Sequence, residues 1–335
     1  MEVVEMTEQR KSSYDVVVVG GGAAGLNGAL MLARARRSVL VIDAGEPRNA
    51  PADGVHGLLG HDGMPPGDLL ARGRAEVRRY GGHVVEGRVV TAAREPDGGF
   101  VVEPAEGPAV RARRLLVTTG LVDELPDVPG LPERWGRDVL HCPYCHGWEV
   151  RDQAIGVLAG GPFSVHQALL FRQLSQDVTL FAHTAPPFTG EEAEQLAARG
   201  IRVVEGRVTG LETEEDRLRG VRLSDGSVVA RDVVVVGTRM TARAGFLSAL
   251  GLRTEEHPAG TFVPSDATGR TEVPGVWAAG NVTDLAAQVG ASAAAGALAG
   301  AQINADLVTE DTRDAVAAHR KAHAAHGAAP EVTAG

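Results

Sequence analysis

The sequence predicts an α/β protein built from two nucleotide-binding domains of common design. Three observations point to this fold class. A β-branched run, Asp15 to Val19, leads into a glycine-rich turn and an apolar helix. A stretch of short strands near residue 84 recurs almost letter for letter near residue 203. The only two cysteines of the chain, Cys142 and Cys145, lie between the two copies.

Length and charge limit the class of partner. The chain of 335 residues is 44% hydrophobic and 23% charged, which suits two globular domains that each bury a core. Its net charge of −10 disfavours nucleic acid and anionic membranes, because neither attracts an acidic protein. We therefore expect a small molecule or a protein thiol. The segment Met1 to Ser12 is polar and carries three glutamates, which is unlike a targeting leader and favours the cytoplasm.

The first domain begins with a complete dinucleotide-binding unit. The strand Asp15 to Val19 is followed by Gly20-Gly21-Gly22-Ala23-Ala24-Gly25 and a helix from Leu26 to Arg36. A second strand, Ser38 to Ile42, ends in Asp43. In such a unit the glycines admit a pyrophosphate to the helix N-terminus, and the acid bonds a ribose hydroxyl. We expect a bound dinucleotide here; the alternative is an ordinary tight turn between a strand and a helix.

An internal repeat defines the second domain. The sequence from Val84 to Val89, VVEGRV, is matched letter for letter from Val203 to Val208. Each copy continues through a hairpin turn, Pro96-Asp97-Gly98-Gly99 or Asp225-Gly226, to a closing strand, Leu115 to Val117 or Val233 to Val236. Each copy also begins with a βα unit, the second at Ala154 to Leu158 with Gly160-Gly161. The chain therefore contains two related nucleotide-type domains.

The cysteine pair predicts the redox centre. Cys142 and Cys145 are spaced as C-x-x-C, and at the start of a helical turn the helix N-terminus lowers a thiolate pKa, so that one sulfur becomes a usable nucleophile. A zinc site would require two further ligands, and no histidine stands at a ligand spacing beside another cysteine. A static disulfide across two residues closes too small a loop to stabilise a fold much. Redox chemistry is the interpretation we prefer to either alternative.

The last quarter is predicted to return to the first domain. Val276-Trp277-Ala278-Ala279-Gly280-Asn281 indicates a strand that ends beside a polar residue. The Ala-rich run from Leu285 to Leu307 follows it and is interrupted by polar residues and glycines. We expect a tightly packed helix there, whose small side chains permit close approach to a sheet or a cofactor, and not a membrane span.

The order of these parts resembles the low-molecular-weight thioredoxin reductases over residues 14 to 307. The resemblance implies two Rossmann-like domains of three-layer ββα design and a homodimer. It further implies a discontinuous FAD-binding domain at 13–125 plus 245–310 and an inserted domain at 126–244 that carries the dithiol. Residues 311–335 would form a C-terminal tail, either a helix tip or a disordered end.

The inserted domain departs from the family at its nicotinamide site. Where the family has G-G-G-D-S-A, this chain has Ala159-Gly160-Gly161-Pro162-Phe163-Ser164, in which Pro162 lacks an N–H and Phe163 adds bulk. Where the family has arginines for the 2′-phosphate of NADPH, this chain has Ala182-His183-Thr184. We expect a vestigial site that no longer binds NAD(P)H; a degenerate but functional site is the alternative.

His146 replaces the aspartate that the family carries after the second cysteine, and histidine is well suited to take a thiol proton near pH 7.

The C-P-Y-C-H-G motif resembles the gliotoxin and holomycin dithiol oxidases, which use FAD and O2 without NADPH. This resemblance implies an FAD-dependent oxidase of a small-molecule dithiol that forms H2O2, with Cys142 facing the substrate, Cys145 next to the flavin, and His146 or, less favoured, His141 as the base. The alternatives are an NAD(P)H-dependent thioredoxin reductase that acts on a protein thiol, and a flavin-bearing thiol redox sensor.

The same resemblance assigns the cofactor residues, and we expect no metal. The predicted FAD contacts are Gly20, Gly22, Ala23, Ala24, Gly25, Asp43, Asn49, Gly120, Gly280, Asn281, Gln288 and Val289. Arg48-Asn49, the segment from His56 to Pro66 and the region from Phe246 to Leu252 are candidates for the wall of the substrate pocket. Their composition does not identify a ligand.

Overall fold

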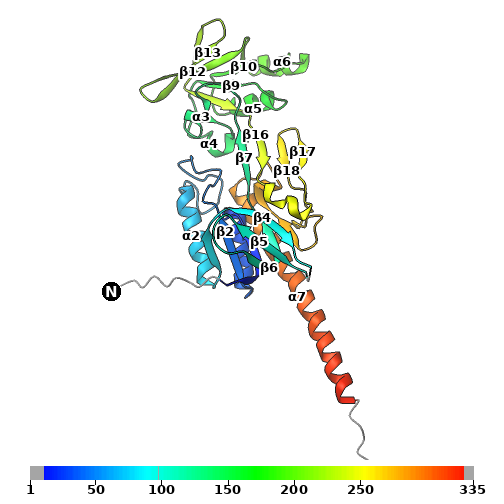
Figure 1. Ribbon diagram of the computed structural model, residues 1–335. Coiled ribbons are helices and arrows are strands. Elements are labelled where there is room, and N and C mark those ends of the chain that lie inside the picture. Colours follow the sequence, from blue (N-terminus) through cyan, green and yellow to red (C-terminus); the bar gives the residue numbers. More distant parts are fainter. Residues whose placement is uncertain (1–10, 97, 328–335) are drawn as a thin grey trace, which may run out of the picture.

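The computed structural model describes residues 11–96 and 98–327, arranged as two α/β halves (Figure 1). Asp97 of the first predicted hairpin turn, and most of the acidic segment from which we expected the cytoplasm, lie outside the described residues. Among the described residues no helix is both long and apolar enough to cross a membrane.

The first half is a seven-stranded sheet with helices on one face. Its central strands are parallel, and the hairpin of β4 and β5 continues the sheet beyond β6. The strands, in spatial order, are β3 (His83–Glu86), β2 (Val39–Asp43), β1 (Ser13–Val19), β6 (Val110–Val117), β5 (Phe100–Pro104) and β4 (Val89–Arg94), with β19 (Val276–Ala278) also paired to β6. The helices are α1 (Ala23–Arg34), α2 (Pro66–Arg79) and α7 (Val289–Gly327), with two short 3₁₀ turns, η1 (Gly245–Leu250) and η2 (Gly280–Val282).

The alternation of side chains along β1 creates two cores, one on each face of the sheet. Val16 and Val18 pack toward α1 and α7, whereas Val17 and Val19 pack toward β4, β5 and the η1 turn. All four valines are buried. Because successive residues of a strand point to opposite faces, a continuous β-branched run is what a strand covered on both sides requires. The three-layer design that the sequence predicts is therefore present.

The second half repeats this plan in smaller form. Its parallel sheet consists of β11 (Arg202–Val204), β10 (Val178–Phe181), β9 (Ile155–Leu158), β15 (Val233–Val236) and β8 (Val139–Leu140), in that order. A separate antiparallel sheet is formed by β12 (Val208–Glu214), β13 (Arg217–Leu223) and β14 (Val228–Ala230). The helices are α3 (Leu131–Arg134), α4 (Pro143–His146), α5 (Ser164–Phe171) and α6 (Gly190–Ala198). The two VVEGRV copies take equivalent places, in β3 and the start of β4 and in β11 and the start of β12.

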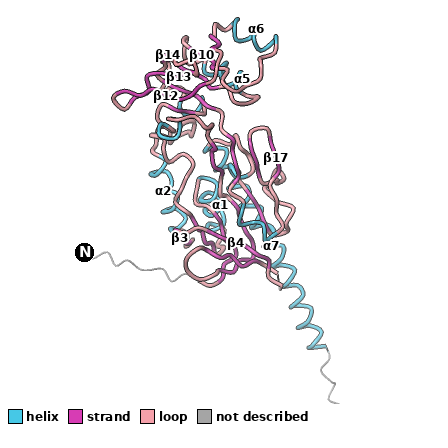
Figure 2. Tube along the Cα trace, turned by 45° about the horizontal axis from the view of Figure 1, so that its top comes forward, coloured by secondary structure: helices cyan, strands magenta, loops and turns pink. Residues whose placement is uncertain are grey.

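A small sheet joins the halves. It contains β17 (Glu255–His257), β18 (Gly260–Phe262), β16 (Arg239–Ala242) and β7 (Leu121–Glu124). Both connections between the halves run through the antiparallel pair of β7 and β16. Figure 1 and Figure 2 show α5 and α6 at one end of the molecule and α1 and α2 at the other, beyond this sheet.

Several predicted bounds are corrected. Helix α1 begins at Ala23, not Leu26, and ends at Arg34, not Arg36. Its end is fixed by Arg36, which has a φ of 64° and so cannot continue a right-handed helix. Helix α7 continues without interruption through the predicted tail as far as Gly327, so the helix-tip alternative holds for that stretch; residues 328–335 lie outside the described part.

The Ala-rich part of α7 packs against α1. A Cβ atom added to Gly296 would lie 1.9 Å from the carbonyl oxygen of Ala24, and one added to Gly300 would lie 2.6 Å from that of Gly28. The two helix backbones thus touch where only glycine fits. The sequence predicted a close approach of this segment to a sheet or a cofactor, whereas the close contact seen here is with helix α1.

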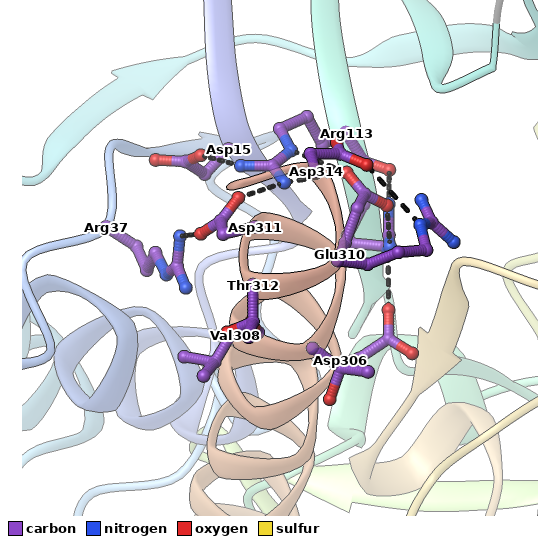
Figure 3. Close-up of polar contacts among 12 residues, drawn as sticks. Asp15, Arg37, Arg113, Asp306, Val308, Glu310, Asp311, Thr312 and Asp314 are labelled. Atoms are coloured by element: carbon purple, nitrogen blue, oxygen red, sulfur yellow. Dashed lines mark hydrogen bonds and ion pairs between the residues drawn. The ribbon is translucent and has the colours of Figure 1, made fainter. Parts of the chain in front are cut away.

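Two arginines on β6 form ion pairs with α7 near Glu310, beyond its Ala-rich part (Figure 3). Arg113 on β6 donates to Asp15, Glu310 and Asp311, and Arg114 donates to Asp306 at 2.7 Å and to Glu310. Burial alone would raise the pKa of Glu310, but the hydrogen bonds from Arg114 and Arg113 lower it below its ordinary value. The carboxylate is therefore ionised at neutral pH and contributes to the anchor.

We expect Arg114→Met to lower the free energy of unfolding by about 1–3 kcal/mol at pH 7, between the values typical of exposed and buried pairs. Because the folded-state pKa of Glu310 is lowered, the pair's contribution is present above the ordinary pKa and is lost as the pH falls through the folded value. The difference between variant and parent in urea denaturation should therefore shrink toward acid pH. Arg222→Met, which breaks the exposed pair with Glu212, is the control and should change stability by less than about 1 kcal/mol.

Candidate active site

A cavity of about 1290 Å³ lies between the two halves. It extends from the glycine turn between β1 and α1, past Cys142 and Cys145, to the start of α5 at Phe163. A pocket for one small ligand is typically about 300–1,000 Å³. The cavity therefore has room for a cofactor and a second ligand.

The turn after β1 presents an open helix end to this cavity. Gly20 has a φ of 105°, and no side chain caps α1 at Gly22. The first N–H groups of a helix have no partner within the helix and attract an anion. A Cβ atom on Gly22 would meet no protein atom within 4 Å, so the space in front of the turn is free of protein. The residues present fit a pyrophosphate.

Eleven of the twelve predicted cofactor residues line the cavity. They are Gly20, Gly22, Ala23, Ala24, Asp43, Asn49, Gly120, Gly280, Asn281, Gln288 and Val289. Asn281 donates its amide hydrogens to the carbonyls of Asp284 and Ala287, which shapes the loop before α7. Asp43 pairs with Arg74 at 3.4 Å.

Gly25 is the exception and is not part of the cavity wall. A Cβ atom there would lie 1.9 Å from the carbonyl oxygen of Gly20. The third glycine of the fingerprint therefore allows α1 to pack closely on its own strand. Gly25 thus contributes to the packing of α1 and not to the wall of the cavity.

Part of the corresponding turn in the second half is bonded by its own serine. The Ser164 hydroxyl accepts hydrogen bonds from the N–H groups of Gly160 at 3.2 Å and Gly161 at 3.3 Å, and donates to the Gly161 carbonyl. Ser164 is buried, and Pro162 has no N–H to offer. Phe163 stands half exposed at the helix start, and α5, like α1, has no side-chain cap. The N–H groups of Gly160 and Gly161 are thus already bonded and position 162 has none, whereas the first N–H groups of α5 are not capped by a side chain.

His183, where the family has arginine, also serves the fold. Its Nδ1 accepts a hydrogen bond from the N–H of Val208 at 3.0 Å, and its φ is 48°. Burial lowers its pKa, so the ring is neutral at pH 7. A neutral imidazole bonded to the backbone offers little to a 2′-phosphate.

Cys142 and Cys145 form a disulfide with a Cα–Cα distance of 5.3 Å. Cys142 is the N-cap residue of α4, as the sequence predicts, and both cysteines line the cavity. The preceding residue, His141, is fixed on two sides. Its Nδ1 lies 3.1 Å from the carbonyl oxygen of Val236, and its own carbonyl accepts from Gln167 on α5 at 2.8 Å. These two contacts hold the segment that leads into Cys142.

His146 is placed differently. Both ring nitrogens are buried and have no hydrogen-bond partner among the described residues. Burial lowers the pKa of His146, and the nearby charge of Glu149 opposes that shift only in part. The ring is therefore neutral at pH 7 and able to accept a proton. Among the described residues no cluster of three or more metal-binding side chains is present.

The sequence did not reveal an ion pair between the loop after β2 and the sheet that joins the halves. Arg48, in the loop after β2, donates to both carboxylate oxygens of Asp123 on β7, at 2.6 and 2.8 Å. Thr238 donates to the same carboxylate at 2.7 Å. Burial favours the neutral acid, but these bonds hold the pKa of Asp123 below its ordinary value. Arg48 was named as a pocket residue, yet no local pattern marks its partner 75 residues later.

Fold and site together describe a disulfide oxidoreductase whose first glycine turn fits a pyrophosphate. The pyridine nucleotide-disulphide oxidoreductase family model matches residues 14–308, and the chain belongs to this family. Thioredoxin reductase tcpT of Claviceps purpurea is 33% identical over 88% of this chain and 95% of its own length. Thioredoxin reductase sirT of Leptosphaeria maculans is 30% identical over 90% of this chain and 96% of its own.

A solved structure is more similar still. The crystal structure of HlmI has a TM-score of 0.87 and 49% identity, and covers 93% of this chain and 98% of that one. The predicted resemblance and fold class are therefore confirmed. The chain is a flavin-dependent oxidoreductase of the thioredoxin reductase-like type, as predicted.

A pair of glycine variants tests the two turns. We expect Gly22→Ala to weaken flavin binding by about 1–3 kcal/mol, roughly 5- to 150-fold, because the added methyl would enter space that only a ligand occupies. Gly160→Ala is the matched control, since its Cβ also meets no protein atom within 4 Å, and should leave flavin retention unchanged. The measurement is the flavin-to-protein ratio from visible absorbance during dilution. Equal retention by both variants would contradict the assignment.

Proposed function

We propose that the protein is an FAD-dependent dithiol oxidase, which closes a disulfide in a small-molecule natural product and uses O2 as the electron acceptor, giving H2O2. The observation that carries this proposal is the contrast between the two turns. No side chain caps α1 at Gly22, whereas the N–H groups of Gly160 and Gly161 are bonded by Ser164. We infer that, of these two turns, the first holds a dinucleotide and the second does not, so the electrons must leave by a route that requires no second nucleotide.

The position of the disulfide favours a small substrate. Cys142 and Cys145 are each partly buried and line the cavity. Tyr144 and Phe163 line the same cavity. Tyr144 is 66% exposed and Phe163 is 50% exposed, so both offer aromatic surface to a ligand in the cavity. A dithiol that enters this cavity meets apolar walls, which suits a ring-bearing metabolite.

The sulfur chemistry follows from the cysteine pair and His146. A substrate thiol gives its proton to His146 and attacks the Sγ of Cys142, which breaks the bond to Cys145 and leaves that sulfur as a thiolate. The second substrate thiol then attacks the substrate sulfur bound to Cys142 and displaces Cys142. The product leaves as a disulfide. Two electrons have then passed to the cysteine pair, one substrate proton lies on Cys142, and the other is held by His146.

FAD, when bound at the Gly22 turn, supplies the chemistry that carries the two electrons from Cys145 to oxygen. The chain's own residues orient it: Asp43 lies where a ribose hydroxyl would be bonded, and the start of α7 at Gln288 and Val289 faces the same cavity. We propose that residues 13–125 and 245–310 form this cofactor domain and 126–244 the inserted one. We also propose that the protein is a homodimer and acts in the cytoplasm.

The decisive test compares two electron donors under anaerobic conditions. We expect a small dithiol to bleach the flavin, and NADPH or NADH at micromolar concentration not to do so, because Ser164 already bonds the N–H groups of Gly160 and Gly161 and Pro162 has none to offer a pyrophosphate. In air, the dithiol should sustain oxygen consumption with stoichiometric peroxide. Rapid bleaching by NADPH would restore the thioredoxin reductase interpretation, and a single turnover without steady-state consumption would favour a redox sensor.

Variants of the dithiol site test the assigned roles. Cys142→Ser should retain the flavin but abolish dithiol oxidation, since the attacked sulfur is gone. His146→Ala should lower turnover by roughly 10²- to 10⁴-fold, and least at alkaline pH, where substrate thiols ionise unaided. Burial keeps His146 neutral to lower pH than a free histidine, so the parent should retain activity on the acid side of pH 7. A rate within a few fold of the parent at every pH would assign His146 to packing.

A further inference from the structure

A loop of the first half reaches the dithiol site of the second half. Residues 55–64 form a closed loop, because Val55 and Met64 pair as an antiparallel bridge at its base. The N–H of Val55 donates to the Met64 carbonyl at 2.8 Å, and the N–H of Gly63 donates back to Val55 at 2.8 Å. Val55 is buried. The residue that follows it, His56, is therefore held in place.

His56 lies between two carboxylates. Its Nδ1 is 3.4 Å from Asp62 within the loop, and its Nε2 is 3.5 Å from Glu149, three residues after His146. Asp62 is fixed in turn by the N–H of Gly57, which donates to it at 3.0 Å. These contacts connect the turn after α4 to a loop that is about 90 residues away in the sequence.

The group formed by Glu149, His56 and Asp62 ends at the surface. The ring nitrogens of His146 are buried without a partner, whereas the side chains of Glu149, His56 and Asp62, in the order of their contacts, are 44%, 25% and 70% exposed. The charged groups that act on His146 are Glu149, His56 and Asp53, and Glu149 and His56 belong to this group. His56 and His146 line the same cavity as the two cysteines. A proton held by His146 thus has titratable neighbours that are accessible to water.

We propose that His56, together with Glu149 and Asp62, passes protons between His146 and water during dithiol oxidation. The inference rests on the proposed function of the same cavity. It makes His56 a positioning and relay residue that the first half contributes to the second half's chemistry. The substrate thiols themselves are handled by Cys142, Cys145 and His146.

The proton balance shows why a relay is useful. Reduction of the protein disulfide by a dithiol moves two electrons from substrate sulfur to cysteine sulfur, and with Cys145 left as a thiolate one of the two substrate protons is left over and must reach water. Attack and departure occur at different sulfurs, so His146 must take a proton at one moment and give one back at another. When the cysteine pair is oxidised again, the proton on Cys142 must leave as well. A buried imidazole without a hydrogen-bond partner can do this repeatedly only if it exchanges protons with a neighbour.

The test measures anaerobic reduction of the Cys142–Cys145 disulfide by dithiothreitol, quenched by thiol alkylation and read by mass spectrometry. This readout requires neither oxygen nor turnover, so a failure of the oxidase proposal, seen as absent oxygen consumption, remains distinguishable. We expect His56→Gln to slow reduction by about tenfold near pH 7, less than the roughly 10²- to 10⁴-fold loss of a direct acid–base group. Added imidazole buffer should restore the rate toward that of the parent.

His61→Gln is the matched control. It removes an imidazole from the same loop, but His61 is exposed and does not line the cavity, so its rate should equal that of the parent. Asp62→Asn should give a smaller loss than His56→Gln with the same response to imidazole. A loss in His56→Gln that is constant across pH and unaffected by imidazole would assign His56 to loop packing and overturn the relay, as would an unchanged rate.

Discussion

The contact between the backbones of α1 and α7 sets the geometry on which the cofactor site depends. Gly28, Gly296 and Gly300 let the two helices touch without intervening side chains. Because the helices are this close, the turn before α1 and the start of α7 both face one cavity, although they are more than 260 residues apart in the chain. Two helix N-termini therefore face the cavity in which we propose that the flavin cofactor binds. A larger side chain at Gly296 would separate them.

The two halves share one topology but differ in their glycine turns. In both, a parallel strand leads through a glycine turn into a helix. No side chain caps α1 or α5, but the hydroxyl of Ser164 bonds the N–H groups of Gly160 and Gly161 internally. A backbone donor that is already bonded offers little to a phosphate. The second half nevertheless remains necessary, since Gln167 and Val236 hold the segment that carries Cys142.

Local patterns in the sequence predicted the parts whose cause is local. The valines of β1, the Gly20 to Gly25 turn, Asp43 and the cap position of Cys142 follow from side-chain period and turn chemistry. The end of α1 was misplaced because the left-handed Arg36 leaves no strong mark in the sequence. The partners of His56 and Asp123 were not predicted because they are set by tertiary contact, and the bonds from Ser164 to its own turn, although local, were also not predicted. Gly25 was assigned to the ligand, although its neighbour is the Gly20 carbonyl.

Helix α7 also gives the molecule a long rigid arm. Its first residues line the cavity, and its 39 residues extend about 58 Å at the usual rise of 1.5 Å per residue. The arginines on β6 clamp it near Glu310, and beyond that point Figure 1 shows it leading away from both halves. The far end is thus one helix length from the cofactor site. A surface, label or second enzyme attached there would be held by a stiff spacer, clear of the path along which small molecules reach the sulfurs.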